Sequence, residues 1–285
     1  MASLIDKKLN RGLGMKLQTK GANLNYEITG SGDPLVLVHG AGDNLGAWYN
    51  QVPELSKHYS VITPDVRGHG DTVVTDGDYS VDACVEDVYQ LIKSLGFESV
   101  AVLGYSMGGG IVTNLTLKHP EVVRALVISN SGGGLGPPPT PEQQRQREER
   151  QKLSREALER GDMETLFKDR LANTFSPGYA DNGPKDQIEK YRAVFMSNDP
   201  KEYLKRMQAG GAAGSPDYSK ISCPTLIIVG EYDQNSGPAA GEAMQKLISG
   251  SQLKVFRTGH ASPIEVAEDY NKTVLGFLAG VETTA

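Results

Sequence analysis

Residues 100–110 read Val-Ala-Val-Leu-Gly-Tyr-Ser-Met-Gly-Gly-Gly, an apolar run that passes directly into a glycine-rich turn. The run has the length and composition of a buried parallel strand, and a helical pattern follows over 107–118. Ser106 therefore lies on a strand-to-helix turn inside the pattern Gly-x-Ser-x-Gly. Glycines on both sides of such a turn permit the close backbone packing that a strained serine needs. We expect the Ser106 hydroxyl to stand above the strand ends as a nucleophile.

Apolar strand patterns alternate with helical patterns on both sides of this turn. Strands are expected at 15–20, 23–29, 34–39, 59–63, 100–104, 123–129, 225–230 and 253–257. Helices are expected at 47–56, 81–95, 107–118, 239–248 and 263–278. Strands separated by helices are typical of a parallel sheet that is covered on both faces. The order predicts an α/β fold with a mostly parallel eight-stranded sheet.

The segment 136–219 interrupts this alternation because it contains no good buried strand. It opens with Pro137-Pro-Pro139, and Thr140, Pro141 and Gln143 then form the signature of a helix start. The run to Arg160 is rich in Gln, Arg and Glu, which predicts a solvated helix with one narrow buried stripe. Helical patterns follow at 163–171, 185–196 and 201–208, before a Gly-rich return at 210–214. We expect a helical lid at 136–219, inserted between core parts at 1–135 and 220–285.

A serine nucleophile needs a base and an acid that orients the base. Of the five histidines, His260 follows the last strand pattern, at the edge where an open sheet places ligand-facing groups. Asp233 follows the strand at 225–230 and lies between Ser106 and His260 in chain order. Glu231 is the nearest rival for the acid. The remaining histidines are expected to be structural or on the surface: His39, His58, His69 and His119.

Five motifs in one order extend this constellation over most of the chain. They are Leu37-Val-His-Gly40, Pro64-Asp-Val-Arg-Gly-His-Gly70, the Ser106 turn, Cys223-Pro-Thr-Leu-Ile-Ile-Val-Gly-Glu-Tyr-Asp233 and Gly259-His-Ala261. With them, residues 34–280 resemble an α/β-hydrolase of the esterase, lactonase and C–C hydrolase branch. The resemblance implies structural roles for His39 and His69. Some relatives place the acid after the preceding strand, where this chain has Ser129-Asn130, and this absence of a carboxylate favours Asp233.

Acyl transfer builds negative charge on the carbonyl oxygen, which backbone N–H groups can stabilise. One donor is expected from Met107, the residue after the nucleophile, and the resemblance places the other at Ala41. The chemistry requires no cofactor and no metal. An apolar pocket is expected between the sheet and the lid. Its candidate residues are Trp48, Tyr105, Phe175, Tyr191, Phe195 and Met196.

Composition narrows the partners and the compartment. The net charge of −6 over 285 residues comes without a dominant basic cluster, so we expect no nucleic acid. No apolar run approaches the roughly 20 residues of a membrane span, and no signal peptide is apparent. Two cysteines cannot form a disulfide framework, which favours the cytoplasm. The expected partner is a small-molecule substrate, and monomer and homodimer both stay open.

These features predict a serine hydrolase that cleaves a small to medium apolar carboxylic ester or lactone through an acyl-enzyme. A C–C bond hydrolase acting on a vinylogous diketone is the main alternative, because the segment Asn130-Ser-Gly-Gly-Gly134 resembles one found before the lid in such enzymes. Those relatives carry a basic residue beside the acid loop, and residues 231–234 contain none, although Arg192 could serve instead. A small-ligand receptor on the same scaffold is a third hypothesis.

Overall fold

The computed structural model describes residues 14–132, 134–136, 138–210 and 216–282. Its centre is one sheet in the order β1-β2-β4-β3-β6-β7-β8-β9, with β5 paired to β2. The strands are β1 (Met15–Gln18), β2 (Ala22–Thr29), β3 (Asp33–Val38), β4 (Tyr59–Pro64), β5 (Val73–Val74), β6 (Val100–Tyr105), β7 (Val123–Ser129), β8 (Thr225–Gly230) and β9 (Gln252–Phe256).

The sheet is mostly parallel, as the strand patterns predict. Pairings from β4 through β3, β6, β7 and β8 to β9 are parallel, and β2 is antiparallel to β1, β4 and β5. The described residues form nine strands, where the sequence predicted eight. The additional strand, β5, has only two residues, too few to produce an alternating pattern that a sequence could display.

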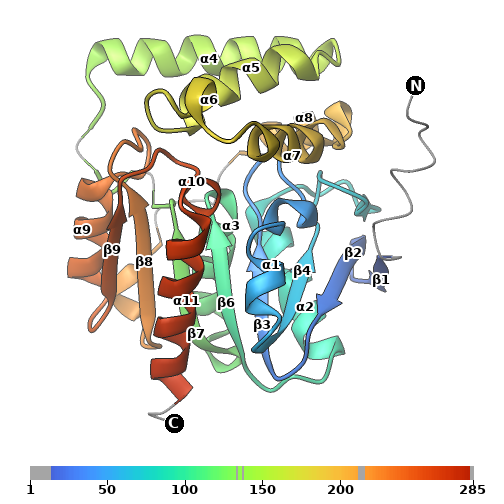
Figure 1. Ribbon diagram of the computed structural model, residues 1–285. Helices are drawn as coiled ribbons and strands as arrows, with labels where there is room; N and C mark the ends of the chain where they lie inside the picture. The colour runs from blue at the N-terminus through green and yellow to red at the C-terminus, as the bar shows by residue number, and fades with distance from the viewer. Residues whose placement is uncertain (1–13, 133, 137, 211–215, 283–285) are drawn as a thin grey trace.

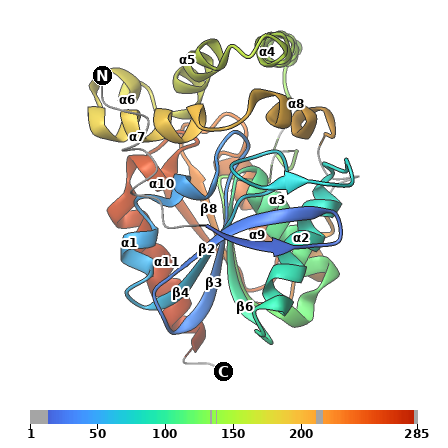
Figure 2. The ribbon, with the colours of Figure 1, turned by 90° about the vertical axis from the view of Figure 1, so that its right-hand side faces the viewer.

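Two helical layers cover the sheet, as Figure 2 shows. Residues of α2 (Val81–Ser94), α3 (Met107–Lys118) and α9 (Pro238–Leu247) pack on one face, and those of α1 (Val52–Leu55) and α11 (Ala267–Glu282) pack on the other. Side chains of β3 alternate between the two cores: Val36 and Val38 face α2 and α3, and Leu35 and Leu37 face α11. This alternation buries both faces and leaves the strand ends as the place for a site.

A third layer of helices lies above the carboxyl ends of the strands, as Figure 1 shows. This upper helical layer consists of α4 (Pro141–Glu159), α5 (Met163–Thr174), α6 (Tyr179–Asn182), α7 (Lys185–Met196) and α8 (Pro200–Gln208). It has an apolar core of its own, which includes Leu158, Phe167 and Phe195. The short α10 (Ser262–Glu265) lies between this layer and the sheet (Figure 1). The division of the chain at 136 and 219 stays a prediction.

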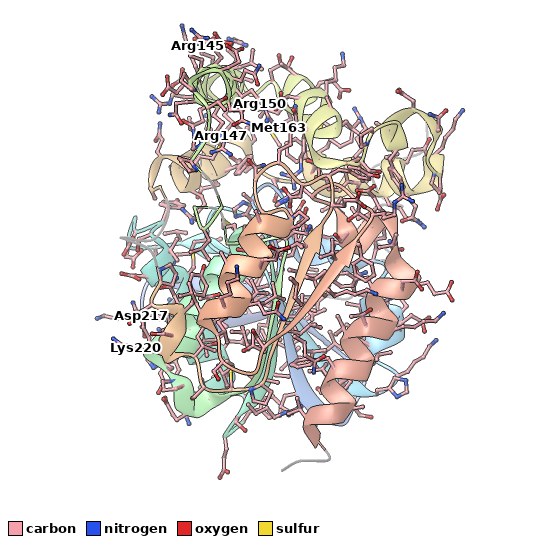
Figure 3. The ribbon with its side chains drawn as sticks, turned by 90° about the vertical axis from the view of Figure 1, so that its left-hand side faces the viewer. Arg145, Arg147, Arg150, Met163, Asp217 and Lys220 are labelled. Carbon is pink, nitrogen blue, oxygen red and sulfur yellow. The ribbon has the colours of Figure 1, made fainter. Side chains whose placement is uncertain are left out.

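Helix α4 begins as its sequence predicts. The Thr140 side chain accepts a hydrogen bond from the N–H of Gln143, and the Gln143 side chain accepts one from the N–H of Thr140. Only Ala157 and Leu158 of this helix are buried. Arg150 of α4, labelled in Figure 3, pairs with Asp169 of α5 at 3.2 Å. Across the described ranges, no helix combines the length and apolar character that a bilayer crossing requires.

Candidate active site

Ser106 occupies the turn between β6 and α3 with a backbone that few residues adopt. Its φ of 55° and ψ of −116° lie outside the regions favoured by non-glycine residues, a conformation that costs on the order of 1–3 kcal/mol. Two backbone hydrogen bonds hold this geometry: Ser106 N–H donates to Ser129 O at 2.9 Å, and Gly109 N–H donates to Ser106 O at 3.0 Å. The strained turn is therefore built into the surrounding strands.

Glycines beside Ser106 let the turn pack directly against neighbouring backbone. A Cβ atom on Gly104 would lie 2.2 Å from Gly108 O, and one on Gly108 would lie 2.0 Å from Val38 O. Both distances are far below van der Waals contact. The second brings the start of α3 against the end of β3, so that the backbones of Met107 and of the loop after β3 lie near each other.

Replacing Gly108 with alanine is expected to push α3 away from β3. The clash involves backbone atoms that cannot rotate aside, so we expect a loss of about 1–3 kcal/mol in the free energy of unfolding and a large loss of activity. Urea unfolding and kcat/KM measure the two effects. Gly110→Ala is the matched control, because a Cβ there meets nothing within 4 Å and alanine favours a helix. Equal behaviour of the two variants would contradict this packing role of Gly108.

The structure brings Ser106, His260 and Asp233 together in one line of hydrogen bonds. His260 Nε2 lies 2.8 Å from Ser106 Oγ, and His260 Nδ1 lies 2.7 Å from Asp233 Oδ2. Residues from the ends of three parallel strands thus meet at one edge of the sheet. The loops after β8 and β9 run side by side, since Tyr232 N–H donates to Thr258 O at 3.0 Å. This pairing sets Asp233 beside His260.

Hydrogen bonds surround the carboxylate of Asp233, which is only 7% exposed. Oδ1 accepts from the N–H groups of Asn235 and Ser236, and Oδ2 accepts from the Ser236 hydroxyl at 2.9 Å and from Asn130 Nδ2 at 3.4 Å. Burial alone would raise the pKa of Asp233, but His260 and the backbone N–H groups of Asn235 and Ser236 hold that pKa well below its usual range. The carboxylate is therefore ionised and fixed in place.

Neither of the other two positions considered for the acid supplies a carboxylate to His260. Glu231 is partly exposed and pairs with Arg257 at 3.6 Å. Asn130, at the position after β7, is buried with a positive φ of 46° and donates to Asp233 rather than replacing it. Ser236 was not anticipated, although its place three residues after Asp233 is a common turn spacing. Within the described residues, no three His, Cys, Asp or Glu side chains are grouped to hold a metal ion.

The oxyanion hole stays a prediction, with the backbone N–H groups of Ala41 and Met107 as its expected donors. Met107 begins α3 directly after Ser106, and Ala41 belongs to the loop after β3. Neither N–H donates to another backbone group in the part of the chain that the structure describes. Both N–H groups therefore have no backbone acceptor among the described residues. The dipole of α3 favours negative charge at the start of this helix.

Side chains from three directions hold the loop that contains Ala41. Gly42 N–H donates to His69 Nε2 at 3.0 Å, and Asn198 Nδ2, after α7, donates to Gly42 O at 2.9 Å. Arg170 of α5 donates to Ala41 O at 2.6 Å and pairs with Asp43 at 2.8 Å. Neither Arg170 nor Asn198 was expected from the sequence, because each acts on a loop more than 120 residues away in the chain.

His69 can accept this hydrogen bond only while it is neutral. Burial, followed by the charge of His39, lowers its pKa well below 6.5. The unfolded chain binds a proton there as the pH falls below about 6.5, whereas the folded chain does not. The contribution of neutral His69 to the free energy of unfolding is therefore fully present above that pH. As the pH falls further, this contribution decreases by up to about 1.4 kcal/mol per pH unit, until the lowered pKa of the folded state is reached.

We expect a lower urea midpoint at about pH 5.5 than at about pH 7.5. These two conditions lie on either side of the ordinary pKa of histidine. His69→Gln keeps an acceptor for Gly42 N–H but cannot titrate, so its midpoint should change less between these two conditions. Comparing the two proteins cancels what the other titrating groups contribute to the pH dependence of stability. Equal slopes in wild type and variant would show that His69 is not the group responsible.

The loop that carries His260 is tied to the upper helical layer. Thr174 O, at the end of α5, accepts from the N–H of His260 at 2.6 Å and from that of Ala261 at 3.1 Å. Glu265 accepts from the N–H groups of Gly259 and Ser176, and burial raises its pKa. The position of His260 therefore depends on the segment after α5.

A small cavity lies near this constellation, and the residues that line it include the chain neighbours of Ser106 and His260 but neither of these two residues. Of the six predicted pocket residues, Trp48, Tyr105 and Tyr191 line it, together with Asp43, Ala261 and Ile264. Phe175 and Phe195 lie in the apolar core of the upper helical layer, and Met196 packs against that core. Sequence cannot separate these two sets, because an aromatic residue on a helix looks the same whether it faces a cavity or a neighbouring helix.

Comparison with known proteins identifies the family of this chain. A family model described as an alpha/beta hydrolase fold matches residues 33–266. The chain belongs to the α/β-hydrolase fold family. The resemblance drawn from the five motifs is thereby confirmed. As an α/β-hydrolase, the protein has the strand-turn-helix context in which a Gly-x-Ser-x-Gly serine acts as a nucleophile.

The relatives of this α/β-hydrolase carry several kinds of hydrolase name. The 2-hydroxy-6-oxo-6-(2'-aminophenyl)hexa-2,4-dienoic acid hydrolase of Metapseudomonas resinovorans is 28% identical, over 91% of this chain and 88% of its own. The structure of an enol-lactonase from Burkholderia xenovorans matches with a TM-score of 0.81 and 28% identity, over 93% and 100% of the two chains. A thermophilic esterase from Thermogutta terrifontis matches equally well, with a TM-score of 0.81, 28% identity and coverage of 95% and 99%.

Proposed function

We propose that this α/β-hydrolase cleaves a small to medium apolar carboxylic ester or lactone through an acyl-enzyme. Ser106 is the nucleophile, His260 the general base and Asp233 the acid that orients it. The observation that carries the proposal is the continuous line from Ser106 Oγ through both ring nitrogens of His260 to Asp233, at 2.8 and 2.7 Å. Esterase and lactonase relatives support the choice of bond.

The first half of the reaction forms the acyl-enzyme. Ser106 Oγ attacks the carbonyl carbon as His260 Nε2 takes the hydroxyl proton. The negative charge on the carbonyl oxygen is stabilised by the N–H groups of Ala41 and Met107. Asp233 stabilises the imidazolium, which then gives its proton to the leaving alcohol oxygen as the C–O bond breaks.

The second half regenerates the free enzyme. A water molecule gives a proton to His260 Nε2 and attacks the acyl carbon, and the same two N–H groups stabilise the charge. Collapse of this intermediate breaks the bond to Ser106 Oγ, which takes the proton back from His260. In an ester the alcohol has already departed, whereas in a lactone alcohol and acid stay in one molecule.

The upper helical layer, α4–α8, serves in this proposal as the lid over the site. Its contacts with the site are polar and specific, through Arg170 to the Ala41 loop and through Thr174 to the His260 loop. A lid that holds both loops couples closure over the substrate to the geometry of catalysis. The cytoplasmic location, the absence of a cofactor and a monomeric or homodimeric state stay predictions.

C–C bond hydrolysis of a vinylogous diketone stays the alternative. The name of the Metapseudomonas resinovorans relative specifies a substrate with a hydroxyl and a ketone at opposite ends of a diene, which favours it. Against it, Arg192 is about half exposed and pairs with Glu164 on the protein surface, so it does not supply the basic group. A small-ligand receptor is the third possibility, and multiple turnover without a partner would exclude it.

A substrate panel separates these functions. Wild type and Ser106→Ala are assayed with p-nitrophenyl esters, unsubstituted lactones and a vinylogous diketone under identical conditions. The proposal expects esters or lactones to be turned over many times by the wild type and not by the variant. Turnover of the diketone alone would establish the alternative, and slow single turnover of every compound would favour the receptor.

A further inference from the structure

Arg170 of α5 donates hydrogen bonds from all three of its side-chain nitrogens. Nη1 donates to Ala41 O at 2.6 Å, Nη2 donates to Asp43 Oδ1 at 2.8 Å, and Nε donates to the Tyr191 hydroxyl. The side chain of Arg170 is 17% exposed and that of Asp43 is 1% exposed. A planar guanidinium bound by three acceptors has little freedom to rotate, so it holds Ala41 O in one place.

Arg170 and His69 together hold both ends of one peptide group. The peptide between Ala41 and Gly42 has its C=O bound by Arg170 and its N–H bound by His69 Nε2, at 3.0 Å. Gly42 has a φ of 73°, and a Cβ atom there would lie 2.9 Å from the Phe195 ring and 3.0 Å from Arg170 Nη1. The loop after β3 is therefore closely packed against the upper helical layer at the point where Arg170 binds it.

The N–H of Ala41 belongs to the peptide group just before this one. It donates to no backbone group within the described ranges. Two successive peptide planes share one Cα atom and differ only by the φ and ψ of that residue. Fixing the second plane therefore restricts the direction in which the Ala41 N–H points. Without Arg170, the second plane would be bound at its N–H end alone and could tilt.

The charge of Arg170 is balanced within the protein. Asp43 is its ion-pair partner, and the two side chains are buried together beside the loop. The guanidinium carbon also lies 5.2 Å from the centre of the Tyr191 ring and 5.4 Å from that of Phe195. A neutralised pair has a weak field at a distance, so we attribute the effect of Arg170 to position rather than to its charge.

We propose that Arg170 is a positioning residue of the oxyanion hole, which holds Ala41 O so that the Ala41 N–H points toward the carbonyl oxygen of the substrate. This inference rests on the proposed acyl-enzyme mechanism, in which Ala41 supplies one of the two donors. Because Arg170 belongs to α5, the hole is complete only while α5 packs on the core. A donor that is misdirected in the transition state lowers kcat and leaves KM nearly unchanged.

Matched oxo and thiono esters test the proposal by kinetics. Arg170→Met removes the donors and keeps a long unbranched side chain. For a p-nitrophenyl ester we expect kcat to fall by about 10- to 100-fold with KM within a few-fold, somewhat less than the roughly 10²–10³-fold cost of losing an oxyanion donor outright. Sulfur is a poor hydrogen-bond acceptor, so hydrolysis of the thiono ester, with C=S in place of C=O, should be slowed much less. Equal losses for the two esters would overturn the proposal.

Further variants separate this effect from a loss of folding. Arg192→Met removes another arginine of the upper helical layer, which is 46% exposed and pairs with Glu164, so its rates should stay within a few-fold of wild type. Arg170→Met leaves Asp43 as a buried charge without its partner, which is destabilising. Adding Asp43→Asn removes that charge but does not restore a donor to Ala41 O. Compared with Asp43→Asn alone, the double variant should show the same selective loss with the oxo ester.

Labelling by a fluorophosphonate separates the proposal from the choice of substrate. The reagent presents a P=O oxygen where an ester presents its carbonyl oxygen, and it modifies Ser106 whichever bond the natural reaction breaks. Labelling should be about 10- to 100-fold slower in Arg170→Met than in Arg192→Met at equal concentrations of folded protein. Equal rates would overturn the proposal. If wild type hydrolyses no ester but this difference is found, the proposed function fails while the positioning role of Arg170 stands.

Discussion

Ser106→Ala is expected to reduce kcat for ester hydrolysis by about 10⁶-fold, as removal of the serine does in other triad hydrolases. The physical reason is that no other oxygen in the constellation can form the acyl-enzyme. His260 and the N–H groups of Ala41 and Met107 remain, and groups of this kind sustain a residual rate of about 10³–10⁴ over water in triad hydrolases. Initial rates with a p-nitrophenyl ester measure the loss.

Ser131→Ala is the matched control for this variant. Ser131 lies near the turn, where a Cβ added to Gly109 would meet its Cβ at 2.4 Å, but it makes no hydrogen bond with His260. Its removal should leave kcat within a few-fold of wild type. A comparable loss in both variants would mean that the turn, and not the Ser106 hydroxyl, limits the rate.

Asp233→Asn is expected to lower kcat by about 10⁴-fold with the fold preserved. An amide at this position can present its N–H₂ to His260 Nδ1, which selects the tautomer with the proton on Nε2. That tautomer cannot take a proton from Ser106, and the positive charge of the imidazolium loses its partner. Kinetics and the urea midpoint are measured together, so that a loss of stability is separated from a loss of catalysis.

Glu231→Gln supplies the control for Asp233→Asn within the same loop. Its carboxylate pairs with Arg257 at the surface, so the rate should stay near that of wild type. Because the pKa of Asp233 lies below its usual range, protonation of this carboxylate does not shape the rate near neutral pH. A large loss in Glu231→Gln with little change in Asp233→Asn would reassign the acid.

Local patterns carried most of the fold prediction. The apolar runs that became β3, β6, β7 and β8 are buried on both faces, and such strands are visible as short continuous runs. The turn at Ser106 could be predicted because glycine is the residue that permits such close backbone packing. The order of Ser106, Asp233 and His260, each after a strand, placed them at one sheet edge, and the structure puts them in hydrogen-bond contact.

The sequence did not predict the contacts between the upper helical layer and the loops of the site. Arg170 reads as one charge among many on α5, and only the packing of that helix shows that it reaches Ala41 O and Asp43. A pattern gives the face that a residue occupies along its own element, but it does not give the partner across the fold.

Site-mapped labelling tests most directly whether Ser106 is the nucleophile. Wild-type protein is treated with a fluorophosphonate and digested, and the modified peptide is identified by mass spectrometry. We predict one adduct on Ser106, its loss in Ser106→Ala, and much slower labelling in a His260 variant that lacks the base. An adduct on another serine, or labelling of Ser106→Ala at the wild-type rate, would contradict this role of Ser106.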